Sequence, residues 1–377
     1  MKRLLPLLLA LSITAVGCSS MLEREYATSS RHVEYPVNED TSILQAESYQ
    51  GLVSALLYFV TEHTDTGVVH LSNYLGDVEA DLDEACAEVL EQDPLGAYAL
   101  RGIDHQHTRI VSYYEVTFTF DYAHTREQME RIIPVGNAHS IPEVLSSALG
   151  SFEKSCVLRL TYFTGSEADL LAQARQVWLD TPLSALAYPE FRVKLYPDSG
   201  SNRVVEYSFS WPEDTEDLAA RKAELEAAAT RVLQELTSSQ DGLSINTLPV
   251  ALHQRVELDS EGGDTAYDAL VSGRCAPRGM TLALQLLCQL AGVESTVVEG
   301  RLGGEARFWL ILSTDQGYRH LDPLAEEVTF ATDEEFSALG FEWSAERYPA
   351  CTDYGAETAA PAAVSEEFEI FSKKFEI

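Results

Sequence analysis

The chain has 377 residues, of which 45% are hydrophobic and 23% charged, and its formal net charge is −34 at pH 7. This length and composition are sufficient for two or three globular units. The acidic balance excludes a nucleic-acid-binding protein, because phosphate recognition needs a positively charged surface.

The first 18 residues carry an export signal. A basic pair, Lys2-Arg3, precedes an apolar run, and small residues then lead to Cys18. This order is typical of a secretory signal peptide. Its end resembles a lipobox, in which cleavage leaves Cys18 as a lipidated N-terminus. We therefore expect a bacterial lipoprotein held at the outer surface of the cell membrane, with residues 1–18 as the signal peptide and residues 19–34 as a tether.

An internal repeat organises the chain up to residue 213. Glu79-Ala80-Asp81-Leu82 recurs 88 positions later as Glu167-Ala168-Asp169-Leu170, and Pro94-Leu95 recurs at the same offset. Hydrophobic periodicity predicts the same order in each copy, namely a helix, a strand, a second helix and a β-hairpin. We therefore predict two small α+β modules, at residues 35–135 and 136–213. The expected helices are 52–60, 80–91, 142–152 and 168–179, and the expected strands are 68–75, 113–122, 157–163 and 204–211.

Neither the histidines nor the cysteines of the chain form a recognisable metal-binding pattern. His105 and His107 share one strand face, but no third ligand accompanies them in the sequence. Cys86 and Cys288 lie on apolar helix faces, where we expect buried free thiols. No metal and no cofactor are therefore expected. Tyr113, Tyr114 and Tyr122 are interpreted as packing residues rather than as a ligand platform.

In the stretch from Ser272 to Pro323, the predicted elements follow one another with short connections. A helix with apolar positions 282–290 ends at Gly292, which is typical of a left-handed residue after a helix. Strands follow at 296–298, 308–312 and 318–322, with residues 300–306 expected as a hairpin loop.

This order resembles the core of a bacterial transglutaminase-like, papain-like cysteine hydrolase domain. Gly273, Gly279, Gly292 and Trp309 match the family pattern without a gap, and flanking matches extend the resemblance over about 215–351. The resemblance implies a transglutaminase-like α+β domain at residues 214–355. Residues 356–377 are then a linker and C-terminal tail, with 368–377 as a terminal strand.

The catalytic positions depart from the family pattern. The same register puts Pro277 where the family has its nucleophilic cysteine, Arg307 where it has its histidine, and Asp322 on its aspartate. Proline offers no nucleophile and arginine is not a base. We expect Arg307 to form a charge-assisted pair with Asp322.

One alternative keeps catalysis. Cys275 lies two residues before the nucleophile position, and a local shift would bring it to the helix start, where the helix dipole lowers a thiol pKa. His320, on the same strand face as Asp322, would then be the base.

Two functions follow from these patterns. The first is a non-catalytic, lipid-anchored surface protein that binds a peptide, a glycan or an envelope protein, and it is the interpretation that we favour. The second is an active cysteine hydrolase or acyl transferase that uses Cys275, His320 and Asp322.

Overall fold

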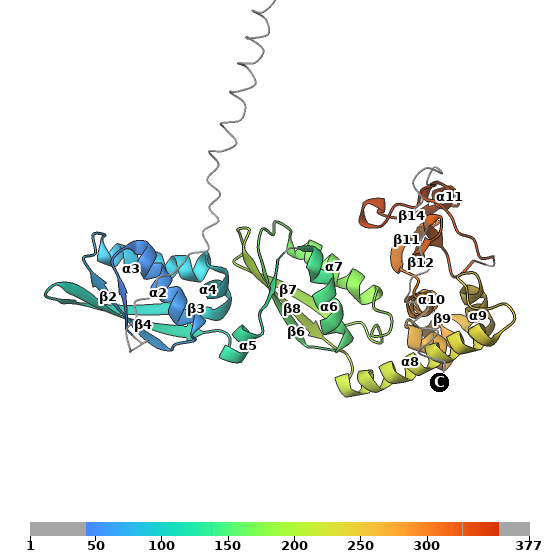
Figure 1. Ribbon diagram of the computed structural model, residues 1–377, viewed down its shortest axis with the longest axis horizontal. Coiled ribbons are helices and arrows are strands. Elements are labelled where there is room, and N and C mark those ends of the chain that lie inside the picture. The colour runs from blue at the N-terminus through green and yellow to red at the C-terminus, as the bar shows by residue number, and fades with distance from the viewer. Residues whose placement is uncertain (1–42, 137, 326, 354–377) are drawn as a thin grey trace, which may run out of the picture. The chain divides into compact units, whose positions relative to one another are not determined.

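The computed structural model describes residues 43–136, 138–325 and 327–353 (Figure 1). The signal peptide, Cys18, the tether and the predicted terminal strand lie outside these residues. The fold is α+β. Its contacts divide the described chain into two compact units, residues 43–86 with 103–120, and residues 87–102 with 121–353. The predicted limits of the three domains stay a prediction. None of the described helices combines the length and the apolar character that crossing a membrane requires.

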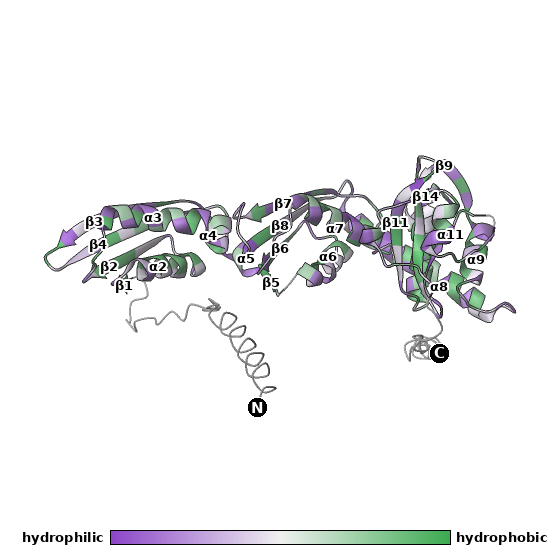
Figure 2. Ribbon diagram, turned by 90° about the horizontal axis from the view of Figure 1, so that it is seen from above, coloured by the Kyte–Doolittle hydropathy of each residue, from purple (hydrophilic) through white to green (hydrophobic). Residues whose placement is uncertain are grey.

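The first sheet has four strands in the order β1-β2-β4-β3. β1 runs parallel to β2, whereas β2 and β4 are antiparallel. The strands are β1 (Ile43–Ala46), β2 (Thr66–Ser72), β3 (Leu100–Ile110) and β4 (Tyr113–Tyr122), and the helices of this part of the chain are α2 (Tyr49–Thr61), α3 (Val78–Glu91) and α4 (Pro94–Ala99). Figure 2 shows that α3 carries both hydrophobic and hydrophilic residues, as an amphipathic helix does.

The second sheet repeats this topology, with the order β5-β6-β8-β7. Its strands are β5 (Ile133–Val135), β6 (Ser155–Leu160), β7 (Glu190–Tyr196) and β8 (Arg203–Ser210), and its helices are α5 (Arg126–Glu130), α6 (Ile141–Gly150) and α7 (Glu167–Leu179). The sequence repeat predicted two α+β modules, but it did not predict the parallel edge strands β1 and β5 or the strand order that the two sheets share. The predicted strands 68–75 and 157–163 were too long, because the chain turns through left-handed residues at Asn73 (φ 55°) and Tyr162 (φ 58°).

The C-terminal part is built around helix α10 (Pro277–Leu290). Proline can occupy the first position of this helix without loss of a hydrogen bond, since the first N–H of a helix has no partner within it. Every residue from Gly279 to Cys288 is buried, and Gly292 follows with φ 76°, as predicted. The other elements are α8 (Thr215–Ser238), α9 (Thr247–Arg255), β9 (Glu257–Gly263), a π-helical turn (Asp268–Ser272), β10 (Arg274–Cys275), β11 (Ser295–Leu302), β12 (Glu305–Thr314), β13 (Gly317–Leu321), α11 (Asp333–Ala338) and β14 (Phe341–Glu342).

A four-stranded sheet in the order β13-β12-β11-β14 packs against α10. The predicted hairpin loop 300–306 is wrong in extent, because β11 and β12 stay paired up to Leu302 and Glu305. The turn consists of Gly303 (φ 61°) and Gly304 (φ 87°) alone. A two-residue hairpin turn of this kind needs left-handed conformations, which glycine adopts without strain.

The sheet separates two hydrophobic cores. Val297, Leu310 and Leu321 belong to the core that contains α10. Their strand neighbours Val298 and Trp309 belong to the other core, which α11 and β14 complete. This division follows from the period of two along a strand.

Candidate functional site

Cys275 lies immediately before α10, but it is not exposed there. It is the last residue of β10, one position before the N-cap Ala276, and its relative exposure is 0%. Burial, followed by the charges of Asp268 and Asp264, raises the pKa of the Cys275 thiol to about 12. The expected lowering by the helix dipole is therefore wrong, because desolvation of the thiolate outweighs it.

Gly279 explains how the chain packs so closely at this point. A Cβ atom on Gly279 would lie 2.9 Å from the Cβ of Cys275 and 2.9 Å from the carbonyl oxygen of Thr265. The glycine thus lets the first turn of α10 rest against the preceding strand. The residue that the resemblance matched to a family glycine has a packing role here.

Phe308, rather than Arg307, faces the start of α10. The Thr281 hydroxyl donates to the Phe308 carbonyl oxygen over 3.2 Å, and the Arg278 guanidinium carbon lies 5.9 Å from the centre of the Phe308 ring. Phe308 packs on the core of α10, whereas Trp309 packs on the opposite core. Strand alternation therefore puts Arg307 on the Trp309 side, away from Pro277.

Arg307 and Asp322 form the ion pair that the sequence predicted. Arg307 Nη2 lies 2.5 Å from Asp322 Oδ2. The other carboxylate oxygen of Asp322 accepts from the Leu324 N–H over 3.0 Å. The Asp322 side chain is only 8% exposed. The pair thus joins β12 to the loop after β13, and it occupies two of the three family triad positions.

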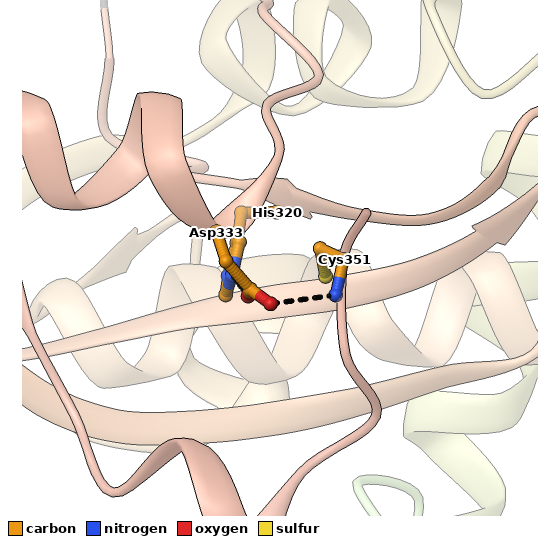
Figure 3. Close-up of side chains that lie close together, drawn as sticks. All are labelled: His320, Asp333 and Cys351. Atoms are coloured by element: carbon orange, nitrogen blue, oxygen red, sulfur yellow. Dashed lines mark hydrogen bonds and ion pairs between the residues drawn. The ribbon is translucent and has the colours of Figure 1, made fainter. Parts of the chain in front are cut away.

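His320 is fully buried and has partners at both ring nitrogens. The Trp309 indole N–H donates to Nδ1 over 2.9 Å, and Nε2 lies 2.8 Å from Asp333 Oδ1. An indole nitrogen can only donate, so Nδ1 must be the acceptor and Nε2 carries the proton. The second oxygen of Asp333 accepts from the backbone N–H of Cys351 over 3.0 Å (Figure 3).

Aromatic rings enclose this histidine. The Phe336 ring stacks on it at 4.6 Å with an interplanar angle of 4°, and the Trp343 ring lies 4.7 Å away. Burial lowers the pKa of His320, while the Asp333 carboxylate opposes that shift. The neutral imidazole is the form that burial favours, and it is also the form whose Nδ1 can accept from the Trp309 N–H.

The donor atoms of His320, Asp333 and Cys351 lie within 4.8 Å of one another, which is close enough to consider a metal ion. However, a metal on Nε2 requires that nitrogen to lose its proton. Nδ1 would then normally carry a proton and donate to an acceptor, but here it faces the Trp309 N–H. These residues therefore do not fit a metal site. Sequence reasoning missed the cluster, because its three members are far apart in the chain and only the fold brings them together.

The alternative catalytic set is not assembled. Cys275 belongs to the core that contains α10, whereas the His320 ring packs against Trp309 and Phe336 of the opposite core. The sheet therefore lies between the thiol and the imidazole. Because both His320 nitrogens already bond to Trp309 and Asp333, neither is available as a base for Cys275.

The structure adds detail to two predictions about the first module. His105 does have a carboxylate partner, since its Nε2 lies 2.9 Å from Asp83 Oδ1. The sequence did not reveal this contact, because Asp83 comes from α3. The His107 ring lies 6.1 Å from the Tyr114 ring, and the His70 ring lies 4.7 Å from the Tyr113 ring. Both tyrosines thus take part in packing.

The five cysteines of the described chain are all free and buried. Burial raises the pKa of Cys86, Cys288 and Cys351 to about 12 and that of Cys156 to about 11. The prediction of buried free thiols at Cys86 and Cys288 is confirmed.

A second buried network surrounds Asp180, the residue after α7. Its carboxylate accepts from Gln176 Nε2, Gln285 Nε2 and the Val297 N–H, each over 2.9 Å, and from the Thr296 hydroxyl over 3.0 Å. Burial raises the pKa of Asp180, and these donors oppose the shift. The network joins α7 of the second repeat to α10 and β11.

Comparisons with known proteins do not assign this chain to a family. No family model matches the chain, and no curated protein matches it. A solved structure described as "Crystal structure of a TGase" aligns with 64% of this chain and 72% of its own chain, at 8% identity and a TM-score of 0.25. At this TM-score the likeness carries no argument about this chain.

Proposed function

We propose that this chain is a lipid-anchored protein of the bacterial cell surface, whose transglutaminase-like domain binds or scaffolds envelope components without catalysis. The observation that carries the proposal is the arrangement around the sheet. Pro277 and the buried Cys275 lie on one side, and the Arg307–Asp322 pair lies on the other. A thiol nucleophile needs a base within hydrogen-bonding reach, and no described residue forms a hydrogen bond with the Cys275 thiol.

A thiol-labelling experiment tests the non-catalytic part. Native protein is treated with iodoacetamide at pH 7.5, and the modified cysteines are identified by mass spectrometry. We expect no faster labelling at Cys275 than at Cys288, because burial raises the pKa of both thiols to about 12. Cys288→Ala serves as the matched control for loss of a buried thiol. Selective labelling of Cys275 that depends on His320, together with turnover lost in Cys275→Ala, would establish the cysteine hydrolase instead.

The membrane attachment is tested separately. We expect cells that express the full chain to incorporate a fatty-acid label, and to lose that label in the Cys18→Ala variant. Partners are then sought by incubating the chain with cell-wall fragments and envelope peptides, with an Arg307→Ala variant for comparison. Attachment that persists in Cys18→Ala would contradict lipidation at this residue.

A further inference from the structure

A groove runs along the uncovered half of strand β6. β5 pairs with β6 only from Leu158 to Leu160. The first half of β6, from Ser155 to Val157, therefore has β8 on one side and no paired strand on the other among the residues that the structure describes. The groove beside it has a volume of about 760 Å³.

The backbone of Ser155 points into this groove. The Phe209 N–H donates to the Lys154 carbonyl oxygen over 2.9 Å, so Lys154 directs its backbone groups towards β8. Backbone directions alternate along an antiparallel pair. The N–H and C=O of Ser155 are thus turned away from β8, and groups of this kind are the template to which an additional strand binds.

The two walls of the groove differ in chemistry. Val144 and Ala148 of α6, with Phe152, form an apolar wall, whereas Gln128 and Arg131 at α5 form a polar one. Helix α6 packs on the core that includes Leu158. Met129 of α5 packs on the opposite face, with Val157. Successive side chains of a strand in the groove would therefore meet the two walls alternately.

The charge at the groove favours an acidic side chain. Arg131 and Lys154 both line it, and neither forms an ion pair with a described residue. The charges of Arg131 and Lys154 are therefore available to a carboxylate of a bound segment. Two carboxylates also line the groove, but Glu206 already accepts from the Tyr196 hydroxyl over 3.0 Å. Glu153 is exposed.

We propose that the C-terminal segment of the same chain, residues 368–377, adds to β6 as an edge strand in this groove. The segment contains an apolar–acidic–apolar triplet twice, as Phe368-Glu369-Ile370 and Phe375-Glu376-Ile377. In either triplet the apolar side chains face the α6 wall, and the glutamate faces Arg131. Residues 354–367 connect the segment to the described chain and span at most about 50 Å when extended. The proposal does not depend on whether the domain is catalytic.

Hydrogen exchange in the full chain tests this assignment. We expect the Ser155 amide to be protected in the natural sequence and to exchange at least tenfold faster in Ile370→Lys/Ile377→Lys, in which neither triplet is intact. The matched control, Lys373→Ser/Lys374→Ser, alters the same segment outside the triplets and should keep the protection. Equal exchange of Ser155 in the natural chain and in the lysine variant would overturn the proposal.

A binding measurement gives a second readout. A peptide of residues 366–377 should bind to the full-length Ile370→Lys/Ile377→Lys protein, whose groove is vacated. Adding Arg131→Glu/Lys154→Glu should weaken binding by roughly 2- to 30-fold, the range expected for two exposed charge pairs. Ser155→Pro should abolish binding while β8 stays paired, since it removes only an N–H that points into the groove. Unchanged binding in the charge variant and in Ser155→Pro would refute the site. A dimer that the lysine substitutions dissociate would assign the segment to a second copy and would also overturn the proposal.

Discussion

Asp180→Ala should cost the protein a large share of its stability. The substitution removes the acceptor of the Gln285 amide and of the Val297 N–H, while Gln176 keeps a second acceptor in the Val297 carbonyl oxygen. Gln285 is 0% exposed, so its amide is shielded from bulk water in the folded protein. Each buried donor left without a partner costs about 1–3 kcal/mol. Two such donors give roughly 2–6 kcal/mol, against about 5–15 kcal/mol for the whole stability of a typical domain.

Urea denaturation followed by tryptophan fluorescence measures this change. Trp178 lies two residues before Asp180, and its ring is buried, so its emission reports on the same region. Asp180→Asn is the matched control, because its amide oxygen can still accept from Val297, and we expect about 1 kcal/mol. A free energy of unfolding for Asp180→Ala within about 0.5 kcal/mol of the natural protein would refute the reasoning, since neutral surface changes have that size.

Three further predictions follow from other contacts. The folded-state pKa of His320 is lowered, so its contribution to stability is present above the unfolded pKa and is lost as the pH falls below about 6.5, by at most about 1.4 kcal/mol per pH unit. The loss should be smaller in His320→Phe. Urea midpoints of the natural protein and of His320→Phe that change in parallel between pH 5 and 8 would contradict this prediction. Arg307→Ala leaves the nearly buried Asp322 without its partner and should destabilise by about 1–3 kcal/mol, whereas Arg307→Ala/Asp322→Ala should recover part of the loss, as a double-mutant cycle would measure. Gly279→Ala places a Cβ 2.9 Å from the Cβ of Cys275 and from the carbonyl oxygen of Thr265, and it should lower the thermal midpoint of unfolding. Gly292→Asn, at a left-handed position, should change the midpoint little. Equal midpoints for Gly279→Ala and the natural chain would argue against the close packing.

Local patterns predicted most elements of the fold. The repeated Glu-Ala-Asp-Leu motif and the hydrophobic periods indicated two copies of one module, and the two sheets share one strand order. Apolar spacing and Gly292 located α10. The errors lie where a turn depends on single residues, as at Asn73 and Tyr162, which adopt left-handed conformations although neither is glycine.

The candidate site was less accessible to sequence reasoning. The Arg307–Asp322 pair could be predicted, because the family resemblance places both residues on neighbouring strands. The contacts of His320 could not, since Asp333 and Cys351 reach it through segments without a regular period. Asp180 gave a weak signal: an acidic residue at the end of a helix is unfavourable for the helix dipole, and here four donors from other elements offset it.

The orientation of Phe308 has a consequence for attempts to engineer activity into this domain. Substituting Pro277→Cys and Arg307→His would restore the residue types of the family pattern. It would not bring the thiol and the imidazole together, because residue 307 lies on the face of the sheet that points away from α10. Residue 308 is the one that faces the start of α10. Strand pleating therefore decides which side chains of β12 face α10, and any attempt to bring an imidazole near residue 277 must take it into account.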